Sequence, residues 1–374
     1  MNLCVVTSSY PANPNDVAAP AAADFCRAIQ RRGHRVFVVA PERPGLEVDT
    51  GEVPVFWIPR GTSKPLVGTN PLSPVELWRT LRLMVDGERL LMRTMRKQSI
   101  DMCLALWAVP AGYLAWRVHS RAGVPYAVWT LGSDINSVAR YPVLRSLIRR
   151  ILRGARWRFA DGIELAARTK AIGGMDCEFL PTTRSLPATA ERVELPGKVR
   201  FLYIGRLERV KGIDVLITAM ARLRDVSGAH LYVIGGGSLE AEVAGQIAST
   251  GLQEMVTMVP RGPATQLVAY MRACDCLVIP SRKESIPVVF SEALQAGIPL
   301  LMTDTGDLGT LAREHHLMHP VPAGDPAALA EAMRTFAVDP AAHRQRFEAA
   351  RAELLKIFDV EAIADHFLSA VGIM

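Results

Sequence analysis

The sequence has few features of secreted, disulfide-bonded or membrane-spanning proteins. Its 374 residues include six cysteines, which mostly lie in apolar runs and form no C-x-x-C pair. The first residues lack the basic segment and the long apolar run of a signal peptide. The longest charge-free apolar stretch, Met102–Trp116, contains Pro110 and Gly112 and is shorter than the ~18 residues that a spanning helix needs. We therefore expect a cytoplasmic protein with reduced, buried thiols.

Internal repeats, low-complexity tracts and a large charge excess are also absent. Apolar residues make up 49% of the chain and charged residues 21%, which excludes a disordered protein and suffices for two hydrophobic cores. The 43 basic and 37 acidic residues give a net charge of +6, which suits an anionic partner. Nucleic acid is a poor fit, because the basic segments are not interleaved with aromatic residues and no recognition motif occurs.

Short apolar runs alternate with helical patterns in both halves of the chain. This alternation predicts parallel sheets built from βαβ units, in two Rossmann-like domains at residues 1–185 and 186–355 followed by a C-terminal helical segment at 356–374. A capping box at Ser73 predicts a helix that runs to about Lys97. The predicted strands are 3–7, 36–40, 103–107, 126–131, 201–204, 231–234, 255–259, 277–279 and 300–303.

Basic residues and glycines follow the first two strands predicted for the second half. Arg206 lies at a strand end and Lys211 at the start of a helix, so both side chains can converge on one anion. The alternative is a solvated basic turn. Gly235–Gly237 follow the next strand, but Glu240 stands where a dinucleotide fingerprint has its third glycine. The pattern indicates a diphosphate site formed by fixed positive charge.

Two glutamates separated by seven residues are the strongest feature. We expect Pro287 in the first turn of a helix, Glu284 in the preceding loop and Glu292 on the helix. Carboxylates accept hydrogen bonds from sugar hydroxyls, and the amides at a helix N-terminus hold phosphate oxygens. Two unrelated surface glutamates are the alternative.

These segments together resemble the family 4 retaining glycosyltransferases of the GT-B fold. The resemblance covers the second half well, through 205–212, 235–237, 284–299 and the turn at 324–326, and the first half more loosely. It implies an α/β fold with two Rossmann-like domains that face each other across a cleft. The first domain would bind the acceptor and the second a nucleotide-sugar, and the last helix would cross back to the first domain.

The resemblance also implies roles for individual residues. Arg206 and Lys211 would bind the donor diphosphate and Glu284 the transferred sugar, as the catalytic set. No metal or cofactor is implied, and the chain has no Asp-x-Asp pair. The implied donor-binding residues are Gly205, Gly235, Gly237, Met258, Val259, Arg261, Val288, Val289 and Glu292. On the acceptor side they are Asp16, Gly132 and Asp134.

The implied reaction is hexosyl transfer from a nucleotide-diphosphate-sugar to a glycan, lipid-linked or small-molecule acceptor. The first half departs from the family, because Leu131 stands where relatives carry a histidine and residues 16–20 replace a glycine pair. These departures keep two alternatives open. One is a nucleotide-sugar epimerase or hydrolase on the same fold, and the other is a non-catalytic donor-binding or scaffold subunit.

Residues 140–158 hold seven arginines and no acidic residue, with leucine and isoleucine at helical spacing. A basic amphipathic helix is typical of a protein that docks on an anionic membrane surface, which would place the enzyme at the inner face of the membrane. The alternative is a helix packed on its own domain with a solvated basic face. The candidate surface residues are Arg145, Arg149, Arg150, Arg153 and Arg156.

Overall fold

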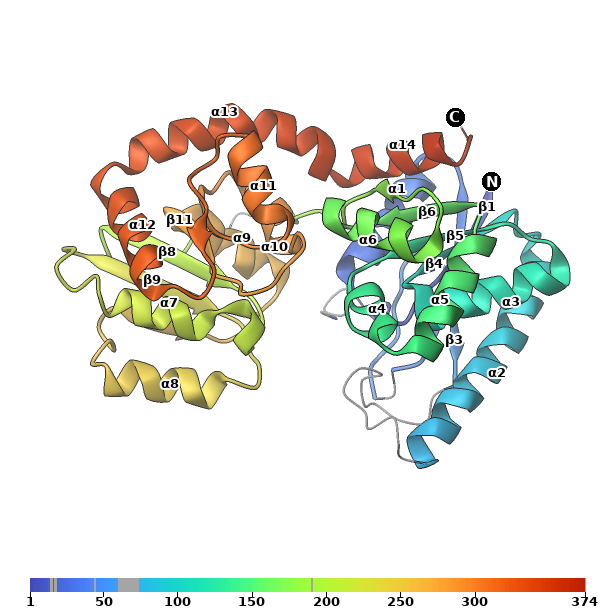
Figure 1. Cartoon of the computed structure of the whole chain (residues 1–374). Helices are drawn as coiled ribbons and strands as arrows, with labels where there is room; N and C mark the ends of the chain where they lie inside the picture. The colour runs from blue at the N-terminus through green and yellow to red at the C-terminus, as the bar shows by residue number, and fades with distance from the viewer. Residues whose placement is uncertain (14–15, 17–18, 44, 60–73, 190, 374) are drawn as a thin grey trace. The chain divides into compact units, whose positions relative to one another are not determined.

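The computed structural model describes residues 1–374 except 14–15, 17–18, 44, 60–73, 190 and 374 (Figure 1). The chain forms two compact units, of which unit 1 comprises Met1–Arg184 and Val360–Met374 and unit 2 comprises Ser185–Asp359. Each unit is a parallel sheet between helices, which confirms the predicted α/β class. Within the described ranges, no helix combines the length and the apolar character that crossing a bilayer requires.

Unit 1 is built on a seven-stranded parallel sheet with the order β3-β2-β1-β4-β5-β6-β7. The chain adds β2 and β3 on one side of β1 and then crosses to β4 on the other side. This crossing creates a topological switch point at the carboxyl ends of β1 and β4. The strands are β1 (Asn2–Val6), β2 (Arg35–Pro41), β3 (Val55–Ile58), β4 (Met102–Leu106), β5 (Tyr126–Thr130), β6 (Trp157–Ala160) and β7 (Glu178–Phe179).

Two hydrophobic cores lie on the two faces of this sheet, because successive side chains of a strand point to opposite faces. Leu3 and Val5 of β1 belong to the core with α1 and α14, whereas Cys4 and Val6 belong to the core with α2, α3, α5 and α6. All six cysteines are free thiols. The helices are α1 (Pro20–Arg31), α2 (Pro74–Gln98), α3 (Tyr113–Ala122), α4 (Ser133–Asn136), α5 (Pro142–Gly154), α6 (Ile163–Gly173) and α14 (Val360–Ala370).

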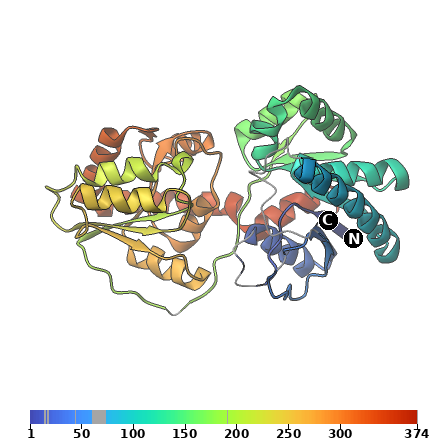
Figure 2. The same ribbon diagram turned by 90° about the horizontal axis from the view of Figure 1, so that it is seen from below.

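Unit 2 has a six-stranded parallel sheet with the order β10-β9-β8-β11-β12-β13, and its switch point lies between β8 and β11. Figure 2 shows this sheet between two helical layers, with α7 and α8 on one side and α9 on the other. The strands are β8 (Val199–Ile204), β9 (Ala229–Ile234), β10 (Val256–Val259), β11 (Cys276–Ile279), β12 (Leu300–Asp304) and β13 (Val321–Pro322). The helices are α7 (Ile213–Met220), α8 (Glu240–Ser249), α9 (Ala264–Ala273), α10 (Val288–Ala296), α11 (Asp307–Glu314), α12 (Pro326–Val338) and α13 (Pro340–Phe358).

The last helix, α14, packs on α1 of unit 1. Phe367 meets Phe25 edge-on with ring centroids 5.4 Å apart, and Arg32 donates a 2.6 Å hydrogen bond to Asp365. All of the preceding helix α13 belongs to unit 2. Its last residue, Phe358, is fully buried. The chain therefore changes unit between residues 359 and 360, four residues after the predicted end of the second domain.

The strands predicted from the sequence are present in the structure, with bounds that differ by one or two residues. The sequence prediction does not include β3, β6, β7 and β13. Three of these strands, β3, β7 and β13, are at sheet edges. Because β7 and β13 are only two residues long, they leave no apolar run in the sequence. The predicted capping residue Ser73 lies outside the described residues, and α2 begins at Pro74.

Candidate functional site

The carboxyl ends of β8, β9, β10 and β11 lie along one edge of the unit 2 sheet, because these strands are parallel. Ligands of open α/β sheets bind at this edge, near the switch point. Several of the predicted site residues lie in the loops that follow the strands there. Gly205 and Arg206 follow β8, Gly235 and Gly237 follow β9, Arg261 follows β10, and Glu284 follows β11.

An ion pair joins the loops after β8 and β11 at the switch point. Lys211 ends a short 3-10 turn, and its Nζ contacts Oε2 of Glu284. The two side chains are 22% and 16% exposed, so both remain accessible to a ligand. Gly212 follows with φ of 70°, and a Cβ atom there would lie 1.9 Å from the carbonyl oxygen of Pro280. Glycine is therefore required for the close approach of the two loops.

The glycines after β9 pack against the loop after β8. A Cβ atom on Gly235 would lie 1.9 Å from the carbonyl oxygen of Gly205, and one on Gly237 would lie 2.5 Å from that of Leu207. The amide of Leu207 also donates a 3.0 Å hydrogen bond to the carbonyl oxygen of Gly236. Contact between the two loops thus explains the absence of side chains at these positions. Contact of Gly205, Gly235 and Gly237 with a donor stays a prediction.

Arg206 presents an exposed side chain at this edge. Its carbonyl oxygen accepts a 2.8 Å hydrogen bond from the Tyr203 hydroxyl, which fixes the main chain. Burial raises the pKa of Tyr203, so the hydroxyl stays protonated and can donate this bond. The Arg206 guanidinium makes no hydrogen bond or ion pair with the residues that the structure describes. Arg206 and Lys211 together place positive charge where the β8 loop meets α7.

Helix α10 starts beside this charge without a side-chain cap. Pro287 is the N-cap residue, one position before the first helical turn in which the sequence prediction placed it. The Pro287 side chain makes no capping hydrogen bond, so it leaves the first amides of the helix, including those of Val288 and Val289, without an N-cap partner. Glu292 lies one turn further along α10 and is only 5% exposed. The helix terminus can attract an anion through its amides and its dipole.

Residues after β12 hold the loop that carries Glu284. A Cβ atom on Gly306, where φ is 50°, would lie 2.0 Å from the Glu284 carbonyl oxygen. The Ser285 hydroxyl donates a 3.2 Å hydrogen bond to Asp307. The sequence interpretation assigned no role to Ser285, Gly306 or Asp307. Gly306 could have been found from the sequence, because it lies between a predicted strand and a helical pattern, as Gly235 does.

Three further predicted donor-binding residues lie on or after β10, at the outer edge of the sheet. Met258 is half-buried, Val259 is buried and Arg261 is exposed. Strand β9 separates them from β8. In the described parts of the chain, no group of three or more His, Cys, Asp or Glu residues could hold a metal ion.

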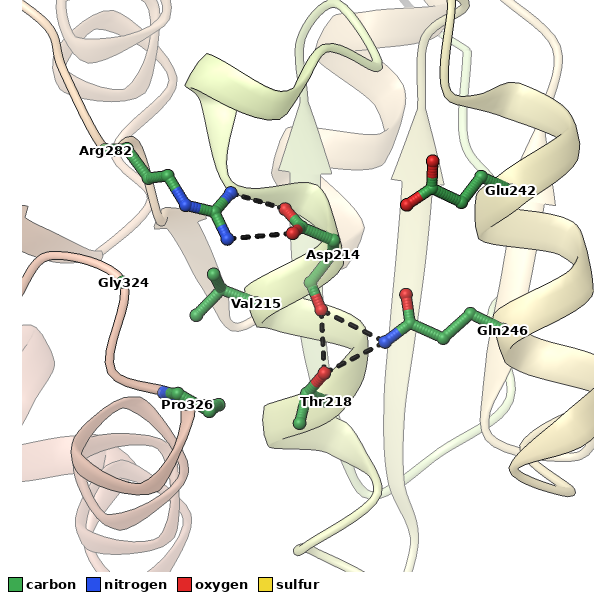
Figure 3. Close-up of a pocket in the computed structure, with 8 residues that line it drawn as sticks. All are labelled: Asp214, Val215, Thr218, Glu242, Gln246, Arg282, Gly324 and Pro326. Carbon is green, nitrogen blue, oxygen red and sulfur yellow. Dashed lines mark hydrogen bonds and ion pairs between the residues drawn. The ribbon is translucent and has the colours of Figure 1, made fainter.

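A separate pocket of about 290 Å³ lies between α7, α8 and the start of α12 (Figure 3). Arg282 lines it and faces Asp214 of α7, whose two carboxylate oxygens accept hydrogen bonds of 2.6 and 2.8 Å. The Gln246 side chain donates to Thr218 at 2.9 Å. None of the predicted donor residues lines this pocket, so it is distinct from the candidate site.

The acidic residues predicted on the acceptor side are bonded within unit 1. Asp16 accepts a 2.8 Å hydrogen bond from the Ala12 amide and pairs with Arg43, and its side chain is 4% exposed. Asp134 lies on α4 after β5 and is 1% exposed. Gly132 precedes α4 with φ of 96°. Asp16 and Asp134 therefore stabilise their loops, and a contact of either residue with an acceptor stays a prediction.

Asp134 joins the loop after β5 to the loop after β4. One carboxylate oxygen accepts a 2.7 Å hydrogen bond from the Ala108 amide, and the other accepts a 3.1 Å bond from the Ile135 amide. Burial raises the pKa of Asp134 from its usual 3.8 to about 6, although these amides favour the charged form. Ala108 follows Trp107, whose φ is 72°, so the bond anchors a strained turn at the switch point of unit 1.

Three apolar side chains of the basic helix α5 pack on its own unit. Ile148, Ile151 and Leu152 are fully buried. For these three residues the structure agrees with the alternative of a helix that is packed on its own domain. Arg149 and Arg153 donate hydrogen bonds of 3.2 and 3.3 Å to carbonyl oxygens at the end of α6. Arg145, Arg150 and Arg156 are exposed, and the guanidinium of Arg156 lies 4.7 Å from the ring centre of Trp157.

Comparisons with known proteins identify the family. A family model described as "Glycosyl transferases group 1" matches residues 189–353, and one described as "Glycosyl transferase 4-like domain" matches residues 18–176. The chain therefore belongs to the group 1 glycosyltransferases of family 4, whose fold is GT-B. The two matched regions fall in unit 2 and unit 1, respectively.

Relatives and solved structures agree with this family. The chain is 32% identical over 204 residues to glycogen synthase of Mycobacterium tuberculosis, covering 54% of this chain and 48% of that protein. It is 25% identical over 361 residues to phosphatidyl-myo-inositol mannosyltransferase of Mycobacterium leprae, covering 92% and 89%. Anabaena HepE, solved with UDP-glucose, has a TM-score of 0.74 at 16% identity over 99% of each chain. The aligned region spans 64% of the length of one further curated relative and 48% of the length of the glycogen synthase.

Proposed function

We propose that the protein transfers a hexosyl group from a nucleotide-diphosphate-sugar to an acceptor, with retention of the anomeric configuration. The observation that carries this proposal is the Lys211–Glu284 pair at the switch point of unit 2, beside Arg206 and the uncapped start of α10. A diphosphate requires fixed positive charge and hydrogen-bond donors, and a sugar requires carboxylate acceptors. The loops after β8 and β11 carry groups of both kinds, which supports the proposal.

In this proposal the bond between the anomeric carbon and the β-phosphate oxygen breaks, and the acceptor oxygen bonds to the same face of that carbon. The acceptor proton passes to the leaving diphosphate. Negative charge grows on the diphosphate during the step, so Arg206 and Lys211 stabilise the transition state more than the ground state. Glu284 orients the sugar, and Glu292 holds the ribose.

We propose that the reaction needs no divalent metal, because Arg206, Lys211 and the α10 amides supply the charge that a metal would otherwise provide. Activity is expected to survive EDTA at a concentration that removes Mg²⁺ and Mn²⁺. A complete loss that is reversed by adding either ion would refute metal independence and leave the transfer reaction itself in place.

The donor can be identified by thermal shift. UDP-, GDP-, ADP- and TDP-sugars should stabilise the protein in the order of their affinities, because binding stabilises by an amount set by ligand concentration over Kd. The structures of Anabaena HepE with UDP and with UDP-glucose make UDP-sugars the first choice.

Single substitutions then test the diphosphate site. Arg206→Ala and Lys211→Ala should each lower turnover by about 10²-fold, as for the loss of one transition-state donor. Arg222→Ala is the matched control, because Arg222 is an exposed arginine of unit 2 outside the candidate site. Normal turnover in both site variants would refute the assignment. Donor binding without transfer to any acceptor would favour the alternative of a non-catalytic subunit.

We propose a lipid-linked glycan as the acceptor and the cytoplasmic face of a membrane as the location. The support is the start of α5, where Tyr141 is 64% exposed and Val143 is 81% exposed next to Arg145 and Arg150. Exposed aromatic and apolar side chains beside arginines suit the interface of an anionic bilayer. Each basic residue near such a surface contributes about 1 kcal/mol, so docking would be weak and salt-sensitive.

Co-sedimentation with vesicles of increasing anionic lipid content, at low and high salt, tests this location. The double variant Arg145→Glu with Arg150→Glu should lose binding, and both arginines can be changed without removing the hydrogen bonds that Arg149 and Arg153 make to α6. The control is Arg222→Glu with Arg346→Glu, which makes the same charge change in unit 2. If the wild type ignores anionic vesicles at low salt, the acceptor is better sought among soluble molecules.

A further inference from the structure

Arg282 connects the loop after β11 with the turn after β8 and with α7, and Figure 3 shows its contact with Asp214 of α7. Its guanidinium donates hydrogen bonds of 2.6 and 2.8 Å to the two carboxylate oxygens of Asp214. The same guanidinium donates a 2.7 Å bond to the carbonyl oxygen of Arg209, and the Arg282 amide donates a 2.9 Å bond to that of Val210. Four hydrogen bonds therefore tie the loop after β11 to the turn after β8 and to α7.

These segments carry the two charged residues of the candidate site. Arg209 and Val210 directly precede Lys211, and Arg282 precedes Glu284 by two residues. No hydrogen bond or ion pair joins Arg282 to Lys211 or Glu284 themselves among the described residues. Any effect of Arg282 on the Lys211–Glu284 pair is therefore transmitted through the main chain of the two loops.

The pairing with Asp214 is well suited to hold a fixed geometry. Asp214 lies in the first turn of α7, where the helix dipole favours a negative charge. Burial opposes its ionisation, but the hydrogen bonds and charge of Arg282 outweigh this effect and lower the pKa of the carboxyl group. A two-pronged arginine–carboxylate bond restricts orientation as well as distance, which a lysine in its place could not do.

We propose that Arg282 is a positioning residue of the donor site. Through Asp214 and the carbonyl oxygens of Arg209 and Val210, it sets the separation of the loops that carry Lys211 and Glu284. The expected effect of Arg282 on catalysis rests on the proposed function. Its structural part, the joining of the two loops, can be measured without any substrate.

The experiment compares Arg282→Ala with a matched ion pair at the other end of the same sheet. Arg200 makes a two-pronged bond to Asp275 at 3.0 and 3.1 Å, with side chains that are 30% and 25% exposed, close to the 33% and 16% of Arg282 and Asp214. Arg200 and Asp275 lie at the amino ends of β8 and β11, away from the candidate site. Arg200→Ala therefore removes a similar pair without touching the donor loops.

Two readouts are needed. Hydrogen exchange of the unliganded protein should increase in residues 206–212 and 281–287 of Arg282→Ala, and in neither segment of Arg200→Ala. With donor, Arg282→Ala should lower kcat by about 10- to 100-fold, the scale of a misplacement of catalytic groups by about 1 Å. Arg282→Lys, which keeps the charge but lacks the fork, should recover only part of kcat and of the exchange protection.

The outcomes separate the two proposals. Loosened loops and a lower kcat in Arg282→Ala alone support the positioning role. Equal exchange and equal kcat in Arg282→Ala and Arg200→Ala would overturn it. If the wild type binds no nucleotide-sugar and not even UDP, the proposed function fails, and the exchange of the two loops still decides whether Arg282 joins them.

Discussion

Replacing Asp134 with asparagine should change how the stability of unit 1 depends on pH. The carboxyl group is 1% exposed, and burial raises its pKa from 3.8 to about 6. Between these two values, the folded protein holds the proton more tightly than the unfolded chain does. The free energy of unfolding of the wild type must therefore fall as the pH rises from about 4 to about 6, and this contribution is constant at higher pH.

The size of the effect follows from the two pKa values. The interval between 3.8 and about 6 corresponds to about 3 kcal/mol, at about 1.4 kcal/mol for each pH unit. Asparagine is neutral throughout, so the variant lacks this contribution. It keeps one acceptor oxygen for the Ala108 amide and turns an NH₂ group toward the Ile135 amide, which costs about 1–3 kcal/mol at every pH. The test is therefore how the difference in free energy of unfolding between wild type and variant changes with pH, and not its value at one pH.

Tryptophan fluorescence during urea unfolding reports on unit 1 alone, because all six tryptophans of the chain, at positions 57, 78, 107, 116, 129 and 157, lie in that unit. The difference between wild type and Asp134→Asn should move by about 2 kcal/mol in favour of the variant between pH 4 and pH 7, because the first part of the ~3 kcal/mol is already lost at pH 4.

Asp365→Asn is the control of opposite sign. Hydrogen bonding to Arg32 lowers the pKa of Asp365, so the wild type gains stability over that variant as the pH rises through the window between the lowered and the usual pKa. Parallel pH profiles for wild type and Asp134→Asn would show that the Asp134 carboxyl group is not perturbed by burial.

Two further predictions concern unit 2. Glu284→Gln removes the negative charge that neutralises Lys211, so calorimetry should show several-fold tighter binding of UDP to the variant while its turnover falls. Weaker UDP binding would argue against a diphosphate at Lys211. Gly235→Ala places a Cβ atom 1.9 Å from the Gly205 carbonyl oxygen, whereas Gly324, with φ of 82°, has nothing within 4 Å. Gly324→Ala should therefore cost only the backbone strain of about 1–2 kcal/mol, and Gly235→Ala distinctly more, in chemical denaturation followed by circular dichroism. Equal losses would mean that the two loops separate freely.

The strands and the family could be predicted because their signals are local. Apolar runs of four to six residues mark β8, β9 and β11 directly in the sequence, and glycines follow β8 and β9. The partners within the site could not be predicted in the same way. Lys211 and Glu284 are 73 positions apart, and Arg282 and Asp214 are 68 apart, so each pairing depends on strand order.

Burial was the other property that the sequence did not determine. Asp134 was a candidate acceptor residue through the family resemblance, but the structure directs its carboxylate to two main-chain amides. The arginines of α5 were interpreted as one surface, yet Arg149 and Arg153 bond to the end of α6. A charge pattern shows which residues are polar, but it does not distinguish those that bond to neighbouring carbonyl oxygens from those that are free to meet a partner.

The return of α14 to unit 1 has a consequence for synthesis on the ribosome. The apolar surface of unit 1 that α14 covers includes Phe25 of α1 and Phe159 of β6, whose rings pack against Phe367. Residues 1–184 leave the ribosome well before residue 360 is made. This aromatic surface therefore stays uncovered while the whole of unit 2 is translated. At about 5–20 residues per second, the 175 residues of Ser185–Asp359 take about 10–35 seconds. During that interval unit 2 can fold as a continuous segment, whereas unit 1 exposes an apolar surface that a nascent-chain chaperone would recognise.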